Sequence, residues 1–471
     1  MPPKPSTERA ARPLDSRDWT DRTMNKRLPL LFRHLTYNLR GGFLVRPLII
    51  ALSLGCAGAF LSWFEEIEPV LNAWVPAVIF PSHTDPQVAQ VILGGIAASI
   101  MTVVSIVFAI LLMTLTLASM QFSPRIIVSF VRDRVTQWTL GIFLGTFCYC
   151  LAALPAARSV PSPFAPVITV LGAMLLSLIC VSWLLFFIHH ISEAINVNQI
   201  VDRIASETVA MINEMMPYPR RYPRVDNNIE TIDPRTWSTT ITCQTSGYIR
   251  YMDTKGLVSI AKTRSVKVHV LRRVGQFVPE GVPLLRVYKG ERLPPGAATE
   301  FCDAFEFGPS RTLQQDIEFG VLQIVDIALK AISPAVNDPS TAISCVDQLS
   351  RVLIRFASRE VPASLLCDPP GVVRVSVMWS DFERMLDSAF EQIRLYSQTD
   401  VAVSLRMMRA LGDIAVTVPD PEYRRTLVER GRRIVSGCAQ KLGEQEMKEL
   451  RSRLAGLEKL LITMPAPLAE K

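Results

Sequence analysis

Four long apolar runs lie in the first 190 residues of the chain, at about 44–64, 96–118, 138–157 and 164–188. Each is close to the roughly 20 residues that an α-helix needs to cross the hydrocarbon core of a bilayer. The one charged side chain within them is Arg46, which lies close enough to the membrane edge to reach the headgroups. Because a charge at the centre of a span costs about 2.5–3.5 kcal/mol, these runs predict four transmembrane helices.

The segments that flank these runs alternate in charge. Residues 1–43 carry nine Lys or Arg against four acids, residues 65–87 carry four acids and no Lys or Arg, and residues 119–137 carry three arginines. Since cytoplasmic segments are enriched in Lys and Arg, we expect a multi-pass protein of a bacterial inner (plasma) membrane with both termini in the cytoplasm. The net charge of +7 is concentrated beside the first span, so it indicates contact with the lipid bilayer and does not indicate nucleic acid.

Small residues recur on single faces of the first and third runs. Gly141 and Gly145 are about one helical turn apart in the third run, and Ala51, Gly55 and Ala59 have the same spacing in the first. Small side chains allow helix backbones to approach closely. These faces predict tight helix packing, either within one four-helix bundle or between subunits.

The second run carries a stripe of small and hydroxyl-bearing residues at alternating steps of about three and four. Its polar members are Thr102, Ser105, Thr116 and Ser119, and it also contains Ala98 and Ala109. Two interpretations remain open: a narrow water-filled pathway in an oligomer, or a packing seam whose hydroxyls bond to carbonyls of their own helix. The spans contain no Asp or Glu, which argues against a carrier with an intramembrane proton relay.

The rest of the chain has the mixed polarity of a packed domain. Isoleucines and valines at helical spacing predict an amphipathic stalk helix over 191–216 that continues the fourth span. Short runs with glycines predict a small β-barrel-like module over 237–290, and apolar periodicity predicts a helical domain over 312–462. The fold class is therefore a membrane protein with a four-helix transmembrane region followed by a cytoplasmic α+β domain.

The predicted β module is similar in part to the half-barrel repeats of biotinyl- and lipoyl-type domains. The similarity is carried by SGYIRYMD and VGQFVPEGVPLLRV. No modifiable lysine occupies a hairpin tip in the usual small motif, so we expect a small barrel without a swinging cofactor.

Residues 314–342 place polar groups in an apolar setting. Asp316, Glu318 and Asp326 are near enough in sequence to gather around a metal, although no metal site is predicted from them. Asp326 is flanked by aliphatic residues, where a carboxylate needs a partner, and Lys330 is one on the same helical face. A structural ion pair and a ligand or regulatory site both remain open for Asp326.

Asp338 has a simpler explanation, because it directly precedes Pro339. Asp at the N-cap followed by Pro at the first helical position is a normal helix start. We therefore expect Asp338 to cap a helix.

The chain lacks the sequence motifs of the common enzyme classes. We find no phosphate-binding glycine loop, no HExxH, no nucleophile elbow and no kinase motif set, and the nine cysteines have no metal-knuckle spacing. We predict no catalytic residues, no metal and no cofactor.

Three stretches together resemble a specific bacterial family. They are SMQFSPRIIVSFVRDRVTQWTLGIFLGTFCYCL, SGYIRYMD and FGVLQIVDIALKAISPAVNDPSTAISCVDQL, and they look like the predicted membrane proteins of domain-of-unknown-function family 2254. The resemblance covers about residues 35–440 and implies an inner-membrane location, while the activity of that family is unassigned. The residues that match its motif stretches are Gln121, Pro124, Arg125, Arg132 and Asp133 in the inner loop, and Asp326, Asn337, Asp338 and Thr341 further on.

Two functional hypotheses follow from these observations. The first is an oligomeric channel-like or transport protein, in which the stripe of the second span faces a pathway and the cytoplasmic domain assembles or gates it. The second is a membrane-anchored sensor or scaffold that recruits a cytoplasmic partner protein. Both place the chain in the lipid bilayer, and the first requires a homo-oligomer. An enzyme is the weakest alternative, since no nucleophile, base and orienting group can be assembled from the sequence.

Overall fold

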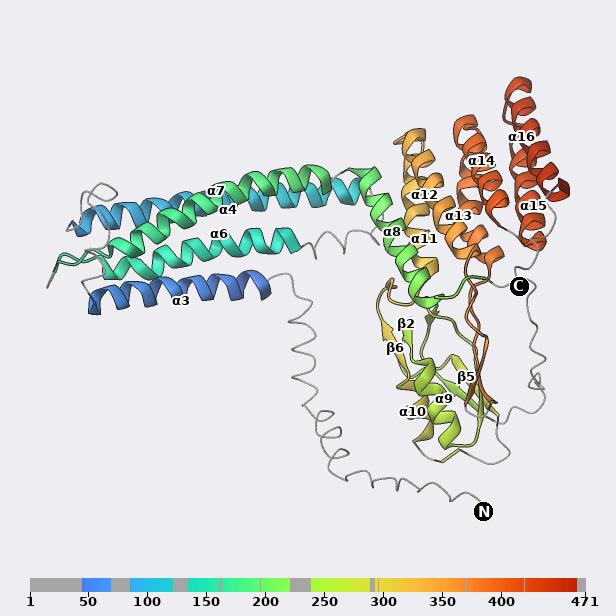
Figure 1. The fold of residues 1–471 in the computed structure, drawn as a ribbon, viewed down its shortest axis with the longest axis horizontal. Coiled ribbons are helices and arrows are strands. Elements are labelled where there is room, and N and C mark those ends of the chain that lie inside the picture. Colours follow the sequence, from blue (N-terminus) through green and yellow to red (C-terminus); the bar gives the residue numbers. More distant parts are fainter. Residues whose placement is uncertain are drawn as a thin grey trace, which may run out of the picture. The chain divides into compact units, whose positions relative to one another are not determined.

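The computed structural model describes residues 45–68, 85–121, 134–160, 163–194, 196–220, 239–288, 293–294, 296–368, 371–418 and 420–463. These residues form two compact units (Figure 1). One contains most of the length of four apolar helices. The other, here called the helix–sheet domain, contains Ser192 and the residues that follow it, together with Thr116 and the described residues up to 121. The predicted basic tail over 1–43 lies outside the described residues.

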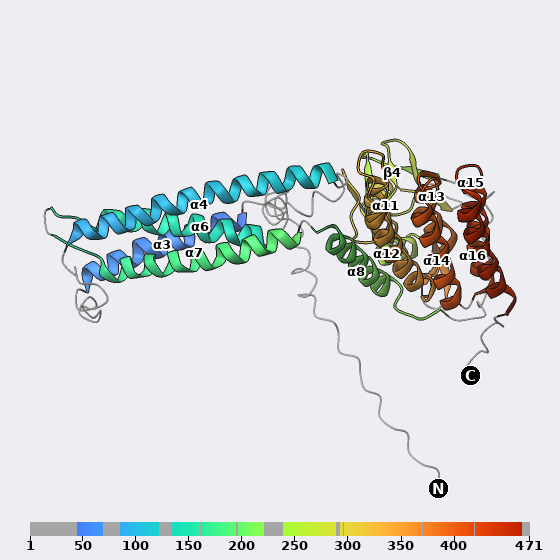
Figure 2. The same cartoon turned by 90° about the horizontal axis from the view of Figure 1, so that it is seen from above.

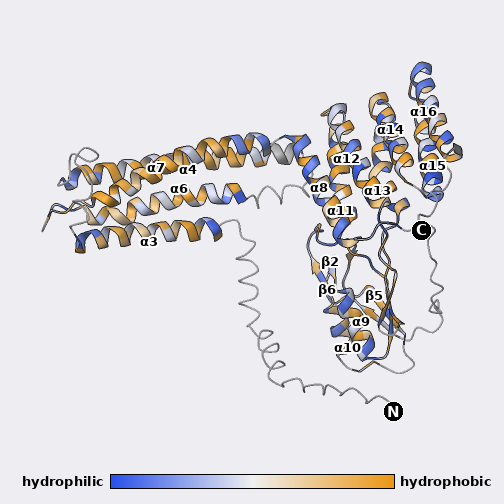
Figure 3. Ribbon diagram, viewed as in Figure 1, coloured by the Kyte–Doolittle hydropathy of each residue, from blue (hydrophilic) through white to orange (hydrophobic). Residues whose placement is uncertain are grey.

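Four helices are long and apolar enough to cross a membrane. They are α3 (Val45–Ile67), α4 (Pro86–Gln121), α6 (Arg134–Ala153, followed by the 3-10 turn η2, Leu154–Ala156) and α7 (Val167–Ala194). Apolar residues cover most of their length (Figure 3). With 36 residues, α4 is about 54 Å long, well beyond the roughly 30 Å of a hydrocarbon core. In a bilayer, α4 therefore tilts or extends past the core.

Helices α3 and α6 pack closely through glycines. A Cβ atom at Gly141 would lie 2.7 Å from Cδ1 of Ile50, and one at Gly145 would lie 2.5 Å from Cδ1 of Leu54. Carbon atoms that are not bonded do not come this close, so a larger residue at either position would require the Ile50 or Leu54 side chain to move. Gly141 and Gly145 therefore face α3 of the same chain, which favours packing within one bundle over packing between subunits.

A buried carboxylate joins the end of α3 to the start of α7. The Oε1 atom of Glu65 accepts the Ile168 N–H at 2.9 Å, and Oε2 accepts the Thr169 N–H at 3.1 Å and the Thr169 hydroxyl at 2.9 Å. The first backbone N–H groups of a helix have no partner within the helix, so an acceptor from another helix can satisfy them. The sequence prediction ended the first span at Phe64, whereas Glu65 lies within α3 and is buried.

The amphipathic helix after α7 is a separate helix, α8 (Val197–Met215). Asn196 caps its start by accepting the Asn198 N–H at 3.1 Å, and α7 ends at Ala194. An asparagine favours such a start because its side chain satisfies a backbone donor of the new helix. The prediction of one continuous stalk missed this break.

Seven helices of the described helix–sheet domain form two stacked rows (Figures 1 and 2). One row is α11, α13 and α15, and the other is α8, α12, α14 and α16. Their bounds are α11 (Ile317–Ala331), α12 (Pro339–Ala357), α13 (Phe382–Tyr396), α14 (Val401–Thr417), α15 (Pro421–Cys438) and α16 (Glu444–Thr463). An aspartate side chain caps the start of five of them, at Asp316, Asp338, Asp381, Asp400 and Asp420. The prediction that Asp338 caps a helix is confirmed.

Arginine–carboxylate pairs cross from one helix to the next in the second row. Arg351 of α12 contacts Asp202 of α8 at 2.9 Å. Arg406 of α14 in turn contacts both carboxylate oxygens of Asp347 on α12. These pairs link neighbouring helices, although an exposed pair such as Arg351–Asp202 contributes only about 0–1 kcal/mol.

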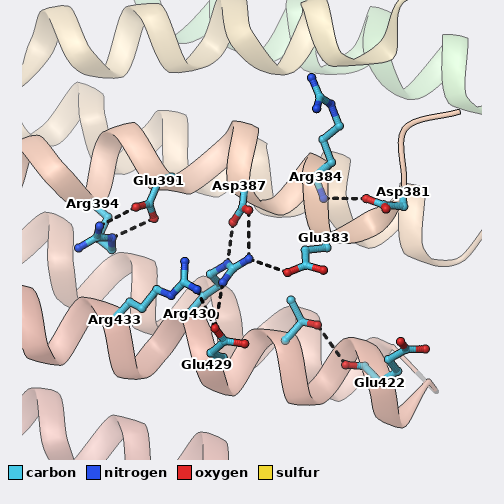
Figure 4. Close-up of polar contacts among 11 residues, drawn as sticks. Asp381, Glu383, Arg384, Asp387, Glu391, Arg394, Glu422, Glu429, Arg430 and Arg433 are labelled. Carbon is cyan, nitrogen blue, oxygen red and sulfur yellow. Dashed lines mark hydrogen bonds and ion pairs between the residues drawn. The ribbon is translucent and has the colours of Figure 1, made fainter. Parts of the chain in front are cut away.

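Arg430 of α15, in the first row, also pairs with carboxylates of a neighbouring helix (Figure 4). Its side chain is 7% exposed, so it is more buried than Arg351 and Arg406. It contacts Asp387 at 2.6 Å and Glu383 at 2.9 Å, both from α13, and Glu429 of its own helix at 3.4 Å. A guanidinium that has left water needs such partners. Arg430 therefore joins α15 to α13.

The strands form two sheets. A five-stranded sheet has the order β1-β5-β3-β8-β7 and a three-stranded sheet has the order β4-β2-β6. Their bounds are β1 (Thr239–Thr242), β2 (Gly247–Met252), β3 (Lys267–Val270), β4 (Phe277–Val278), β5 (Pro283–Tyr288), β6 (Phe305–Gly308), β7 (Leu365–Asp368) and β8 (Val372–Ser376). Their apolar faces share one core with α9 (Thr254–Thr263) and α10 (Ala297–Cys302). A barrel-like closure is not confirmed for the described strands.

Two strands come from a region that was predicted to be helical. β7 and β8 follow α12, and β8 pairs in parallel with β3 through Val268 and Val375. The apolar side chains of β8 complete the core that begins with β1 to β6. The sheet is therefore assembled from two distant parts of the chain, which the predicted division at residues 290 and 312 did not anticipate.

We expect Gly320→Ala to destabilise the helix–sheet domain. The added Cβ would lie 2.0 Å from Oγ1 of buried Thr208, where α11 meets α8, and overpacking of this kind costs about 1–3 kcal/mol. Thermal unfolding of the purified full chain measures the effect. Gly412→Ala is the matched control, because no atom lies within 4 Å of its added Cβ. Equal melting temperatures for the two variants would contradict the close α8–α11 contact.

We expect Arg430→Met to lower the free energy of unfolding by about 2 kcal/mol, because charge-assisted hydrogen bonds to a buried group are lost. Arg433→Met is the matched control on the same helix, since Arg433 is 47% exposed and pairs with Glu429 at 2.7 Å. Exposed pairs contribute about 0–1 kcal/mol. Urea unfolding followed by circular dichroism compares the free energies of unfolding of the two variants. A larger loss of stability for Arg433→Met than for Arg430→Met would contradict the stabilising role of Arg430.

Candidate functional site

The stripe on α4 faces away from its own bundle. Five of its members are exposed in a single chain: Ala98, Thr102, Ser105, Ala109 and Thr116. Leu93, Ile100 and Val107 are buried among residues of α6 and α7. At about 100° per residue, the two sets lie on opposite sides of the helix. The α4 stripe, defined by the five exposed residues, is therefore not a packing seam within one chain.

The stripe hydroxyls bond to carbonyls of their own helix. Thr102 Oγ1 donates to the Ala98 oxygen at 3.1 Å, and Ser105 Oγ donates to the Met101 oxygen at 3.0 Å. Each hydroxyl proton is thus satisfied while the oxygen lone pairs remain able to accept. Hydroxyls of this kind are compatible with a closely packed helix interface and also with a helix face in contact with water.

Part of the predicted constellation lies outside the described residues. This applies to the side chains of Ser119 and Gln121 and to Pro124, Arg125, Arg132 and Asp133 of the inner loop. Their roles remain predictions.

Asp338, Asn337 and Thr341 lie together at the turn between α11 and α12. The Thr341 N–H and hydroxyl both donate to the Asp338 carboxylate, the former at 3.1 Å. Asn337 has a φ of 49°, in the left-handed region that Asn adopts more readily than most residues. Asn337 therefore lies in the turn between the two helices, and Asp338 starts α12.

Asp326 is half-buried in the middle of α11, and Lys330 is exposed in its last turn. Asp326 lies two helical turns before the Asp338 turn. The structure does not bring these two carboxylates into one cluster, and the ligand role of Asp326 remains a prediction.

A network of arginines and carboxylates surrounds the start of α11. Asp316, which is 4% exposed, caps the helix and receives two hydrogen bonds from Arg311, at 2.7 and 2.9 Å. Glu318 accepts the Ser388 hydroxyl at 2.9 Å and lies 3.3 Å from Arg384. Burial raises the pKa of Asp316, and Arg311 opposes that shift.

This network also involves two of the three acids that the sequence suggested could gather around a metal, Asp316, Glu318 and Asp326. The first two carboxylates point at guanidinium groups. In the described part of the chain, no group of three or more His, Cys, Asp or Glu side chains is arranged to hold a metal ion.

A pocket of about 40 Å³ lies beside this network, between the start of α11 and the strands. Its polar lining comes from Arg273, Gln315, Asp316, Glu318 and Ser380. Its apolar lining includes Met215, Met252, Phe356 and Trp379. The pocket therefore combines one guanidinium with a largely apolar wall, in a volume well below the roughly 300–1,000 Å³ of typical small-molecule sites.

Arg273 is the cation of this pocket. Its Nη1 atom donates to the Ser380 hydroxyl at 3.1 Å, and no carboxylate of the described residues lies within ion-pair distance. Burial lowers the pKa of Arg273, and nearby Arg384 adds to that shift. The guanidinium stays protonated in any case, so the pocket can receive an acceptor group.

Sequence reasoning missed Arg273, Arg311 and Arg384. They come from three separate segments of the chain, and only the packing of helices against strands brings them together. The one local signal in the sequence was the glycine at position 275. In the structure Gly275 has a φ of 87°, and a Cβ there would lie 2.2 Å from the Asp316 carboxylate. A glycine in a short polar turn can mark such a close approach.

We expect Asp338→Asn to change how stability depends on pH. The Thr341 hydroxyl holds the pKa of Asp338 below its ordinary value. A carboxyl with a lowered folded-state pKa stabilises the fold above the unfolded-state pKa of about 3.9, and that contribution is lost as the pH falls through the folded pKa. The melting temperature should therefore fall less steeply below about pH 4 in Asp338→Asn than in the wild type. Thr341→Val should have a similar effect, and unchanged acid dependence in both variants would contradict it.

The family described as "Predicted membrane protein (DUF2254)" matches residues 40–413. The chain is similar to uncharacterized protein Rv1290c of Mycobacterium tuberculosis and uncharacterized protein Mb1321c of Mycobacterium bovis. Each is 30% identical over 411 residues, which covers 86% of this chain and 77% of the relative. No solved structure matches the chain.

Proposed function

The chain belongs to the DUF2254 family of predicted membrane proteins, and from that premise we propose that it is a homo-oligomeric, channel-like protein in which the α4 stripes of several copies face a shared pathway. The helix–sheet domain then lies in the cytoplasm, where it assembles or gates the pathway. The observation that carries this proposal is the outward direction of the α4 stripe.

The exposure of α4 supports an association between copies. Within one chain, α4 is the least buried of the four candidate spans. Of its most apolar stretch, 11% is buried, against 50% for α6. A helix that contributes little to its own bundle has most of its surface free for another partner. In lipid, small side chains favour helix association because the backbones can approach closely.

The chemistry of the stripe supports a hydrated path. Thr102 and Ser105 are polar groups on a face that would otherwise be apolar, and their oxygen lone pairs can accept hydrogen bonds from water or a solvated ion. Ala98 and Ala109 leave space beside them. Copies arranged around an axis with these residues inward would form a narrow lumen without ionised side chains.

The connection from α7 to the helix–sheet domain supports a gating role. Two residues, 195 and 196, separate α7 from α8. α8 is held in the helix rows by the Arg351–Asp202 pair and by Arg355, whose Nε donates to Asn213 at 2.5 Å. A movement of the helix rows would therefore carry α8 with it and act on the end of α7.

Cysteine cross-linking tests the assembly. In a background without native cysteines, Ser105→Cys and Thr102→Cys should each give disulfide-linked dimers in membranes. Leu185→Cys on α7 is the control, because Leu185 is 67% exposed but lies outside the stripe. Dimers from Leu185→Cys alone would contradict an α4 interface.

Ion flux through liposomes tests the pathway. Ala109→Trp should reduce flux at least tenfold by filling the lumen, whereas Leu185→Trp should leave it unchanged. A strictly monomeric protein that gives no flux in the wild type would overturn the proposal.

The pocket at the start of α11 favours a second candidate, a membrane-anchored sensor or scaffold. Arg273 supplies a binding group and the surrounding helix rows supply a surface for a cytoplasmic partner. In that case Thr102→Ala together with Ser105→Ala would leave function intact, while Arg273→Gln would abolish it. Arg272→Gln is the matched control, since Arg272 is adjacent in sequence and does not line the pocket.

A further inference from the structure

One end of the helix rows is joined to a candidate span by a short connection. α7 ends at Ala194 and α8 begins at Val197, so two residues, 195 and 196, separate the two helices. A fully extended chain gains at most about 3.6 Å per residue. The end of the helix–sheet domain at which α8 begins therefore cannot move far from the end of α7.

The turn between α11 and α12 lies at this same end of the domain. Arg351 of α12 contacts Asp202 of α8. One turn further along α12, Arg355 contacts Asn213, which also lies further along α8, so the two helices run in the same direction. Asp202 is in the second turn of α8 and Arg351 is in the fourth turn of α12, so α12 begins about 10 Å beyond the start of α8. Residues 332–338, which connect α11 to α12, lie at that protruding end.

The connection between α13 and α14 closes the same end. The first turns of α11 and α13 are in contact through Glu318 and Arg384, at 3.3 Å. These two helices pack side by side and are each 15 residues long, so they also end at about the same level (Figure 1). Axes of packed helices are about 10 Å apart. Residues 332–338 and 395–400, here called the loop end, therefore lie next to each other.

The loop end exposes apolar side chains. Val336 is 48% exposed, Leu395 is 49% exposed and Tyr396 is 70% exposed. Pro334 and Ala335, beside Val336, are also exposed. Apolar groups are driven out of water, and Tyr is enriched at membrane–water interfaces, where its ring is in an apolar setting and its hydroxyl is hydrated. These side chains therefore suit the interface of a bilayer.

The charges of the loop end also suit a lipid surface. Its two acids, Asp338 and Asp400, are half-buried and accept backbone N–H groups at the starts of α12 and α14. Lys330, in the last turn of α11, is exposed. A lysine beside apolar side chains can contact lipid phosphates and is attracted to anionic lipids.

We propose that the loop end docks on the surface of the bilayer that α7 crosses, with Val336, Leu395 and Tyr396 in the interface and Lys330 at the headgroups. The lipid surface is the occupant because two residues of chain hold this end of the domain close to a candidate span. The proposal requires that α7 crosses the membrane. It does not require a pathway along α4, so loss of ion flux and loss of docking can be told apart.

Fluorescence quenching in liposomes tests this contact. A nitrobenzoxadiazole label is placed on the full chain, in a background without native cysteines, through Val336→Cys or Tyr396→Cys. Val416→Cys is the matched control, because Val416 is 52% exposed and lies in the last turn of α14, away from the loop end. Lipids with a nitroxide on the headgroup should quench the labels at positions 336 and 396 about twofold more strongly than the label at position 416, because interfacial side chains lie at headgroup level. Circular dichroism establishes that the labelled variants are folded.

Lipid composition tests the part assigned to Lys330. Replacing part of the phosphatidylcholine by phosphatidylglycerol should strengthen the quenching at position 336, and Lys330→Gln should remove that gain. An equal gain in Lys330→Gln overturns the assignment of Lys330 to the headgroups.

Two results overturn the docking itself. One is equal quenching by nitroxide lipids at all three labelled positions, or none at positions 336 and 396. The other is a label at position 336 or 396 that is shielded from aqueous iodide but not reached by the nitroxide lipids. That second result would assign the loop end to contact with a second copy of the chain or with another protein.

The supporting result is quenching by nitroxide lipids at positions 336 and 396 that exceeds the quenching at position 416.

Discussion

Three large side chains on one side of α4 fix which way that helix faces. Leu93, Ile100 and Val107 are buried against α6 and α7. They repeat every seven residues, which returns to nearly the same side of an α-helix. The small and hydroxyl-bearing residues lie on the other side as a consequence. The most distinctive surface of the candidate spans is therefore left outside its own bundle.

The other spans do not share this arrangement. The glycines of α3 face side chains and backbone of α6, and the glycines of α6 face side chains of α3. Glu65 joins α3 to α7 by accepting hydrogen bonds from backbone N–H groups at the start of α7. These contacts account for the small residues and the acid inside one chain. The five residues that define the α4 stripe are instead exposed in a single chain, which is why the stripe carries the functional proposal.

The helix–sheet domain combines an apolar core with polar links between its helices. Arg351, Arg406 and Arg430 each reach a carboxylate on a neighbouring helix. The Arg351–Asp202 pair is exposed and contributes about 0–1 kcal/mol, and desolvation of Arg430 opposes the gain from its contacts. α8 also buries Ile200, Ile204 and Ile212 in the helix–sheet domain.

Local patterns in the sequence predicted the parts of the fold that depend on local physics. Four apolar helices followed from hydropathy, and the cap at Asp338 followed from Asp-Pro. The break at Asn196 was missed because helical periodicity continues on both sides of it. β7 and β8 were missed because β8 pairs with β3, which is far away in the chain, and β7 pairs with β8. For the same reason Arg273, Arg311 and Arg384 could not be grouped, since their neighbours are set by tertiary packing.

We propose that the α4 stripes of neighbouring copies face one another. Pulsed electron paramagnetic resonance on a spin label at Ser105, with the protein in lipid nanodiscs, measures this most directly. We expect a short distance between labels on different copies, together with strong contact of the label with water. A label that shows no partner and contact with lipid chains alone would contradict it.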